Sequence, residues 1–277
     1  MAFRAALAMQ PPYPTDELPG LHAVASAATL GERPREPRVL RGIGADWPAV
    51  RRWSFAHLAA LAPSLSVDLV VGNREMGRTR FASCALGDYL SELASPRAGD
   101  APPRHLKEFD LLARFPHLRR DLRPEALFPR WSIVASSAWI GPARARTGLH
   151  CDRLDNVAML VAGRKRFYLA PPDALRSPDD LSGKYDRWAT LACLSFRELA
   201  TRGGDVGPLH AVDLLPGDAL YVPAGWWHEV VNLEASILLS GFFGSPGCVI
   251  EQWLRTGAVH AAHVAGLWRR GHCTCHG

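Results

Sequence analysis

Short apolar segments, each ended by glycine or proline, fill most of the second half of the chain. Their β-branched and aromatic residues and their regular turn signals are typical of strands. Seven such strands in succession favour a double-stranded β-helix, or jelly-roll. We therefore predict a mostly β fold with flanking helices. The seven segments are residues 131–141, 155–163, 164–172, 210–217, 218–225, 228–233 and 236–244.

A His-x-Asp pair, His150 and Asp152, lies just before the second of these segments. Residues two apart on a strand point to the same face, so the two side chains could bind one ion while Cys151 faces away. A histidine from another strand would complete a two-histidine, one-carboxylate set with open positions opposite, which suits non-haem Fe(II). An isolated pair of this kind is more often an ordinary polar pair on a strand, so the surrounding residues decide the interpretation.

Three sequence blocks around the pair decide it. The first, T-x-L-H-x-D-x-x-D-N, begins at Thr147; the second, G-x-K-x-F-x-L-x-P-P, contains Lys165; the third, G-D-x-L-Y-V-P-x-x-W-W-H, ends at His228. In this order, over roughly residues 37–243, they resemble the jumonji C, or cupin-like, family of Fe(II)- and 2-oxoglutarate-dependent oxygenases. The resemblance implies a cupin-type jelly-roll and an enzyme that uses Fe(II), 2-oxoglutarate as cosubstrate, and O2.

The resemblance also assigns the metal ligands. His150, Asp152 and His228 would bind the iron and are the predicted catalytic residues. His210 competes for the third position, but it lacks the Pro-x-x-Trp-Trp-His context of His228. The tryptophans of that block, Trp226 and Trp227, are expected to pack the strand that aims His228.

Four further residues are candidates for binding the cosubstrate. Lys165 is expected to pair with the far carboxylate of 2-oxoglutarate, because an inward-facing lysine is costly unless it is paired. Thr147 is expected to add a hydroxyl bond to the same carboxylate, and Asn156 to contact the cosubstrate or orient a ligand. His105 stands where the family commonly carries a tyrosine that reaches the cosubstrate, and it could donate the same bond.

A second departure from the family pattern lies at Ser240 and Gly241, near a position where many relatives carry Asn or Ser. The contact made there in relatives is therefore in doubt for this chain.

The domain organisation is predicted to be simple. A flexible arm over residues 1–19, with four prolines, precedes a cupin-like oxygenase domain over residues 20–246. A C-terminal helix and tail over residues 247–277 are expected to pack on the domain or on a partner in a homodimer. Within the domain we predict strands at residues 39–40 and 66–72, a helix that begins after the N-cap Ser54, a helix over residues 86–93, and an amphipathic helix over residues 105–118.

Two segments are left with open interpretations. The charged insertion over residues 172–207, which contains Tyr185 and Trp188, is either a rim that meets substrate or a solvated excursion. The C-terminal HCTCH over residues 272–276 carries four donors that suit zinc or copper. Four donors in five residues at a chain end do not close one tetrahedron comfortably, so we do not predict a site there.

The composition of the chain indicates which kinds of partner and which cellular compartment to expect. The net charge is +5, and nearly all the basic residues are arginines scattered along the chain, which disfavours nucleic acid without excluding it. No apolar run approaches the roughly 20 residues of a membrane helix, so no membrane partner is expected. Six cysteines without a framework spacing indicate a reducing compartment, and we predict a cytoplasmic protein.

The predicted function is a hydroxylase acting on a protein or peptide side chain or on a small molecule. Hydroxylation is favoured over N-methyl-lysine demethylation because no reader module accompanies the barrel. Two alternatives remain: a modified-tRNA-base hydroxylase, and a metal-binding cupin without oxygenase activity. Lys165 and Thr147 argue against the latter, since a metal-holding cupin needs no deep carboxylate pocket.

Overall fold

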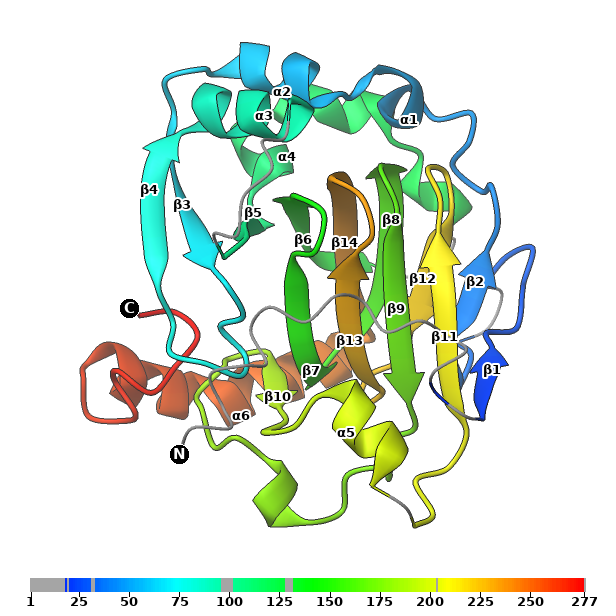
Figure 1. The fold of residues 1–277 in the computed structure, drawn as a ribbon, viewed down its shortest axis with the longest axis vertical. Coiled ribbons are helices and arrows are strands. Elements are labelled where there is room, and N and C mark those ends of the chain that lie inside the picture. Colours follow the sequence, from blue (N-terminus) through cyan, green and yellow to red (C-terminus); the bar gives the residue numbers. More distant parts are fainter. Residues whose placement is uncertain are drawn as a thin grey trace.

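The chain forms two large β-sheets with helices at their ends and along one side (Figure 1). The computed structural model describes residues 18, 20–30, 33–95, 102–127, 132–202 and 204–276. The predicted N-terminal arm therefore lies almost wholly outside the described residues. No helix in the described ranges is long and apolar enough to cross a membrane.

Eight strands, four in each of the two sheets, build the jelly-roll, which confirms the predicted fold. One sheet contains the neighbouring strands β12, β8, β14 and β6, and the other contains β11, β9, β13 and β7. Every neighbouring pair within these two sets is antiparallel. The strands are β6 (Ser132–Gly141), β7 (Arg146–Asp152), β8 (Asp155–Ala162), β9 (Lys165–Ala170), β11 (Leu209–Leu214), β12 (Ala219–Val222), β13 (Trp227–Asn232) and β14 (Ser236–Gly244).

Other strands extend both sheets, and helices lie at both ends of the strands. In Figure 1 the short helices α1 to α4 gather above the strands, while α5 and α6 lie at the opposite end. The additional strands are β1 (Leu21–Ala23), β2 (Arg38–Leu40), β3 (Ser66–Val71), β4 (Phe81–Ala85), β5 (Arg104–Phe109) and β10 (Ala189–Leu191). The helices are α1 (Pro48–Arg52), α2 (Phe55–Leu61), α3 (Leu86–Ala94), α4 (Leu111–Arg114), α5 (Phe196–Thr201) and α6 (Pro246–Val264).

The amphipathic helix predicted over residues 105–118 is wrong in its first half. That segment begins as the strand β5, in which Leu106 pairs with Ile140 and Phe109 with Ala138 of β6. Pairing with β6 and β3 outweighs the helical spacing of the apolar residues, because a short apolar pattern does not by itself distinguish a strand from a helix. Only α4, four residues long, and a following 3-10 turn keep helical geometry.

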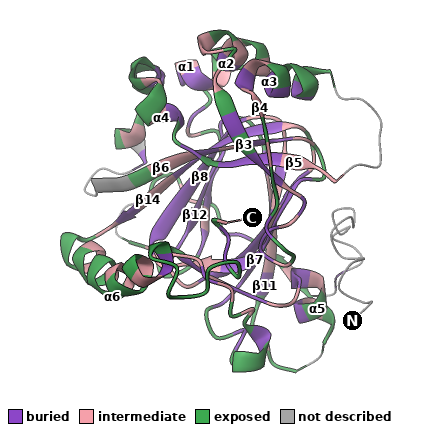
Figure 2. Ribbon diagram, turned by 90° about the vertical axis from the view of Figure 1, so that its left-hand side faces the viewer, coloured by how far each residue is buried: buried purple, intermediate pink, exposed green. Residues whose placement is uncertain are grey.

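The other strands and helices predicted between residues 39 and 93 are confirmed. Ser54 caps α2 by accepting a hydrogen bond from the His57 amide at 3.1 Å. The strands β2 and β3 and the helix α3 lie where they were expected. Burial is concentrated in the jelly-roll strands, whereas α6 is largely exposed on its outer side (Figure 2).

The turn between β8 and β9 carries the chain from one sheet to the other and places Lys165. Gly163 in this turn has φ +79°. A Cβ there would overlap the backbone carbonyl of Ala235 and lie 2.8 Å from the Cα of Ser236. Glycine is therefore required at this position for two reasons, the left-handed backbone and the close approach of another strand.

Gly163→Ala should lower the free energy of unfolding by more than the roughly 1–3 kcal/mol of left-handed strain alone. Gly42→Ala is the matched control, because Gly42 also has φ +62° but nothing within 4 Å of its Cβ position. Urea denaturation of both variants measures the difference. Equal losses would show that the contact with Ala235 and Ser236 does not constrain this turn.

Candidate metal centre

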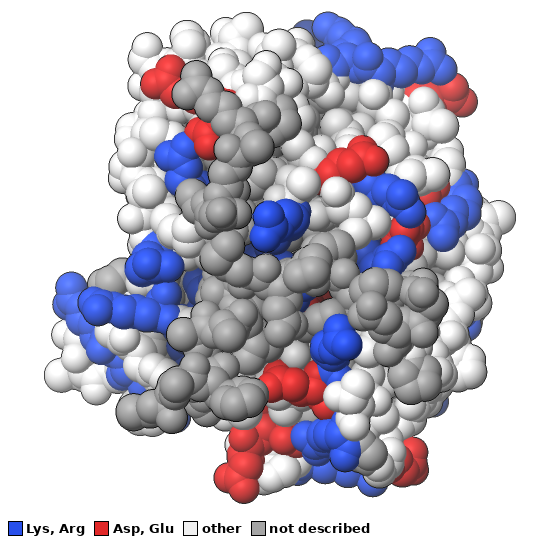
Figure 3. Space-filling model, viewed as in Figure 1, with Lys and Arg blue, Asp and Glu red and all other residues white. Residues whose placement is uncertain are grey.

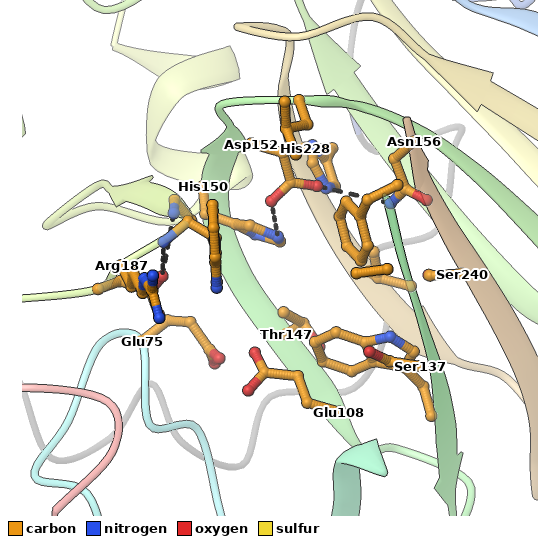
Figure 4. A pocket seen from close by; sticks show the side chains of 18 of the residues that line it. Glu75, Glu108, Ser137, Thr147, His150, Asp152, Asn156, Arg187, His228 and Ser240 are labelled. Carbon is orange, nitrogen blue, oxygen red and sulfur yellow. Dashed lines mark hydrogen bonds and ion pairs between the residues drawn. The ribbon is translucent and has the colours of Figure 1, made fainter. Parts of the chain in front are cut away.

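The pairing of β7 with β13 brings two histidines face to face. His228 of β13 stands directly opposite His150 of β7, and their ring centroids are 4.1 Å apart. Asp152 follows two residues after His150 and so points to the same face. The three side chains point toward one another at one end of the sheet (Figure 4).

The donor atoms of these residues are close enough to share one ion. Asp152 Oδ1 lies 4.0 Å from His150 Nε2, and Asp152 Oδ2 lies 3.7 Å from His228 Nε2. One ligand atom from each of the three residues lies within 4.8 Å of the others. Two imidazoles and one carboxylate on one face fit a divalent metal such as Fe(II), with coordination positions left open toward the cavity.

Backbone carbonyls fix the orientation of both imidazoles. His150 Nδ1 donates to the Gly148 carbonyl at 2.7 Å, and His228 Nδ1 donates to the Trp226 carbonyl at 3.0 Å. A carbonyl can only accept, so in each neutral ring the proton lies on Nδ1 and the lone pair on Nε2. Such contacts commonly orient metal-binding histidines.

Burial makes this cluster electrostatically incomplete without a cation. It raises the pKa of the Asp152 carboxyl to about 6. Burial, together with the nearby His150, lowers the pKa of His228 well below its ordinary value, which keeps that ring in the neutral, metal-binding form. A bound cation would stabilise the Asp152 carboxylate, so the residues present fit the expected metal.

A cavity of about 480 Å3 opens beside the three candidate ligands. Its size is in the range of small-molecule sites. Lys165, Thr147 and Asn156, three of the four predicted cosubstrate residues, line it. They come from three different strands, β9, β7 and β8.

Lys165 is the most unusual side chain of the cavity. It is 2% exposed, and burial, together with the nearby Lys107 ammonium, lowers its pKa to about 7. No hydrogen bond or ion pair joins it to another residue in the described part of the chain. A buried ammonium without an anionic partner is costly, so this position favours a ligand that brings a negative charge.

Lys107 shows what a satisfied buried lysine looks like in the same protein. Its ammonium lies 2.8 and 2.9 Å from the two carboxylate oxygens of Glu75. Burial alone would raise the pKa of Glu75, but Lys107 and Arg74 lower it to about 2. Glu75 also accepts a hydrogen bond from the Gly148 amide at 3.3 Å and thereby supports the strand that carries His150.

Sequence reasoning missed this ion-pair group. Glu75 lies in a segment without a predicted element, and Lys107 lies where a helix was expected. The one available signal was that Lys107 is among only three lysines in an arginine-rich chain.

A bulge allows Thr147 and His150 to line the same cavity. Residues three apart on a regular strand face opposite sides. The register between β7 and β13 shifts between His228 and Val230, so that Val230 pairs with Thr147. Bulges next to active sites commonly re-aim side chains in this way.

Asn156 stands next to the candidate ligands. Its Nδ2 donates to Asp152 Oδ2 at 3.5 Å, which agrees with the expectation that it orients a ligand. Its Oδ1 is buried and has no hydrogen-bond partner among the described residues, so it is available to a bound molecule.

The structure places His105 outside the set of cavity-lining residues. It is buried, and its ring contacts Trp139, which does line the cavity, at 6.2 Å between centroids. Neither of its ring nitrogens has a partner in the described ranges. A direct contact between His105 and the cosubstrate stays a prediction. Ser240, together with Ser137 on the neighbouring strand, does line the cavity.

The charged insertion forms part of the cavity wall. Its strand β10 pairs with β7, so that Leu191 lies opposite His150 and Ala189 opposite Asp152. Trp188 and Asp186, which precede this strand, line the cavity mouth. The Tyr185 side chain is not among the residues that line the cavity. Its ring packs against His260 and His263 of α6.

Comparison with known proteins places this geometry in a family. The profile of the cupin-like domain matches residues 32–247. The chain belongs to the cupin-like, jumonji C-type family. Members of this family use Fe(II), 2-oxoglutarate and O2, and His150, Asp152 and His228 could bind the iron.

The chain is similar to several curated proteins. It is 28% identical over 237 residues to the arginine-specific demethylase JMJ22 of Arabidopsis thaliana, covering 78% of this chain and 43% of that protein. It is 25% identical to HSPB1-associated protein 1 of Mus musculus, covering 83% and 50%. It is 24% identical to the lysine-specific demethylase 8 of Danio rerio, covering 82% and 58%. The chain thus spans about half the length of these relatives.

The competing third ligand, His210, lies apart from the cluster. It is half-buried on β11, where its ring contacts His22 and Trp226.

His228→Ala should therefore weaken Fe(II) or Co(II) binding by at least about 100-fold, more than the loss of a supporting hydrogen bond. His210→Ala should bind the metal like the parent. Anaerobic titration with the metal compares the affinities of the two variants. Normal affinity in His228→Ala and weak affinity in His210→Ala would show that His210 is the third ligand.

Proposed function

We propose that the protein is an Fe(II)- and 2-oxoglutarate-dependent oxygenase that hydroxylates a side chain of a protein or peptide. The observation that carries the proposal is the presence of Lys165 in the same cavity as His150, Asp152 and His228. The three ligands account for a metal, and the buried ammonium accounts for a second, anionic molecule beside it.

Each side chain of the cavity has a distinct task in this proposal. His150, Asp152 and His228 hold Fe(II), while Lys165 and Thr147 bind the far carboxylate of 2-oxoglutarate. Bound Fe(II) supplies the activation of O2 that couples decarboxylation of 2-oxoglutarate, to succinate and CO2, with insertion of one oxygen atom into a C–H bond. Asn156 holds Asp152 in place, and the apolar wall limits access of water. That wall includes Trp139, Phe167, Val230 and Leu238.

The alternative of a metal-holding cupin without oxygenase activity leaves Lys165 unexplained. Such a protein would keep an unpaired ammonium at 2% exposure with no benefit, although Lys107 shows that this fold can supply a carboxylate partner. The contrast between the two lysines supports a cosubstrate site.

The charges at the cavity mouth favour a cationic or neutral substrate group. Glu108, Asp110 and Asp186 line it, against the cations Arg74 and Arg187. Arg74 and Glu108 pair with each other, and Arg74 also pairs with Glu75, which leaves Asp110 and Asp186 against Arg187. This distribution fits a basic or amide side chain of a peptide. The relatives from Arabidopsis and Danio are named for arginine and lysine, which are both basic.

A modified-tRNA-base substrate is less well supported. Among the described residues visible in Figure 3, acidic and basic side chains are interspersed and form no continuous basic stripe for a phosphate backbone.

The direct test of the proposed function is succinate formation from 2-oxoglutarate by the purified protein with Fe(II), ascorbate and O2. We expect slow turnover alone and faster turnover with arginine- or lysine-containing peptides, one of which gains 16 Da. Absence of succinate from a protein that binds both Fe(II) and 2-oxoglutarate would contradict the proposal.

Lys165→Met removes the ammonium but keeps an unbranched side chain. Loss of a bond to a charged group of about 1.5–3 kcal/mol should raise the Kd for 2-oxoglutarate by roughly one to two orders of magnitude. Fe(II) binding should change little, because Lys165 is not a ligand. Lys184→Met is the control, since Lys184 does not line the cavity and its ammonium donates to the backbone carbonyls of Arg74 and Gly77. Anaerobic calorimetry measures the Kd for 2-oxoglutarate of both variants. The same Kd in the two would show that Lys165 does not bind the cosubstrate.

Trp188 is the rim residue best placed to contact a substrate. It lines the mouth and is 40% exposed, and the Arg187 guanidinium lies 4.6 Å from its ring centroid. Trp188→Ala should raise the KM for a peptide substrate about tenfold and leave uncoupled succinate formation unchanged. Leu181→Ala, in the same insertion at 38% exposure but away from the cavity, should change neither. Loss of uncoupled turnover in Trp188→Ala would instead indicate a structural role.

A homodimer through α6 and a cytoplasmic location stay predictions. The helix contacts β14 of its own domain and leaves Ile250, Trp253 and Leu254 exposed.

A further inference from the structure

Four metal-binding side chains converge at the C-terminal end of the chain, away from the cavity. His263 comes from the last turn of α6, while Cys273, Cys275 and His276 come from the tail that follows. One ligand atom from each lies within 4.8 Å of all the others. The HCTCH segment thus contributes three donors, and the helix supplies the fourth in place of His272.

The measured spacings suit a tetrahedral ion. His263 Nε2 lies 3.1 Å from Cys275 Sγ, and His276 Nδ1 lies 3.3 Å from Cys273 Sγ and 3.5 Å from Cys275 Sγ. In a tetrahedron with Zn–S of about 2.3 Å and Zn–N of about 2.0–2.1 Å, neighbouring donors are about 3.3–3.8 Å apart. Small movements of the side chains would therefore admit the ion.

The tautomer of His263 is already set for coordination. Its Nδ1 donates to the Trp268 carbonyl at 2.7 Å, so its Nε2 presents a lone pair toward the sulfur of Cys275. A backbone carbonyl on the other ring nitrogen is the usual support of a zinc-bound histidine.

The burial pattern gives an independent reason to expect a metal. His263 is the only buried residue of α6, at 0% exposure, and Cys273 is 1% exposed. None of the apolar clusters of the described residues includes a residue of α6 or of the tail. A segment that buries histidine and cysteine instead of a hydrophobic core commonly takes its stability from a metal.

The chain reverses direction after α6, which brings the tail back to His263. The helix ends in a reversal in which the Gly266 amide bonds to the His263 carbonyl and the Leu267 amide to the Ala262 carbonyl. Gly266 and Gly271 have φ +79° and +85°, values that glycine adopts without strain. The tail therefore returns to the last turn of the helix.

We propose that His263, Cys273, Cys275 and His276 form a structural Zn2+ site. Four protein donors leave no open position for a water or substrate, which distinguishes this site from the candidate iron centre. The proposal does not depend on the oxygenase activity.

The site would fasten the tail to the rim of the cavity. The Tyr185 amide donates to the His272 carbonyl at 2.9 Å, and the Thr274 amide donates to the Tyr185 carbonyl at 3.1 Å. The Thr274 hydroxyl donates to Asp186 Oδ2 at 2.6 Å, and the Tyr185 ring packs 4.1 Å from that of His263. Thr274 lies between the two cysteines, so a metal on those cysteines would hold the backbone just before Trp188.

Metal analysis of the protein over residues 1–277 tests the site. We expect about one equivalent of zinc in addition to iron after dialysis against a weak chelator, and its loss in Cys273→Ser, Cys275→Ser and His276→Ala. Two controls should retain zinc: His272→Ala, within HCTCH but outside the cluster, and Cys248→Ser, a half-buried cysteine elsewhere on α6. Absence of zinc from the parent, or equal loss in His272→Ala, would overturn the assignment.

Two measurements on the unmutated protein cover the case in which the variants do not fold. Cys275 is exposed, so it should react with iodoacetamide only after a strong chelator removes the metal. Co(II) added to the chelated protein should give the thiolate charge-transfer and tetrahedral d–d bands of a Cys2His2 site. Immediate alkylation before chelation, or a Cys273–Cys275 disulfide in the reduced preparation, would show that the cluster holds no metal. Hydrogen exchange at residues 182–188 should increase on chelation if the site holds the rim.

Discussion

The candidate centre depends on one pairing of strands, that of β7 with β13. It sets His150 opposite His228, and the two-residue period of β7 adds Asp152 to the same face. A shift of β13 by one residue in this register would turn His228 to the face opposite His150 and Asp152. The neighbouring β9 pairs with β13 on its other edge and β10 with β7, so both strands are held on two sides. The candidate metal ligands therefore lie on strands that have a partner on both edges.

Charge balance supports the proposal that two ligands bind in the cavity, a metal ion and an anion. Asp152 lies beside the imidazoles of His150 and His228 with little exposure, and Lys165 is buried beside another cation. Direct pairing between them would satisfy both, but no such contact joins them in the described part of the chain. A divalent metal on one side and a dicarboxylate that reaches from the metal to the lysine satisfy both charges together. This complementarity connects the metal site to the cosubstrate site.

The sequence predicted the strands of the jelly-roll well because both their apolar content and their turns are local signals. The ligands were recognisable for the same reason, as short blocks of fixed spacing. The features that escaped prediction depend on contacts between distant parts of the chain. β5 has helical apolar spacing but pairs with β6, and Glu75 reaches Lys107 across a segment without a clear pattern. Likewise HCTCH alone does not close a tetrahedron, and His263 joins it only because the chain reverses after α6.

The central claim is that this cavity recognises a 2-oxo acid at the metal and a second carboxylate at Lys165. Anaerobic calorimetry on the Fe(II)-loaded, unmutated protein tests it by comparing 2-oxoglutarate with 2-oxopentanoate, which keeps the chelating end and lacks the far carboxylate. We predict that 2-oxopentanoate binds at least about tenfold more weakly, the minimum expected for loss of a charged hydrogen bond. Equal affinities for the two acids would contradict the claim.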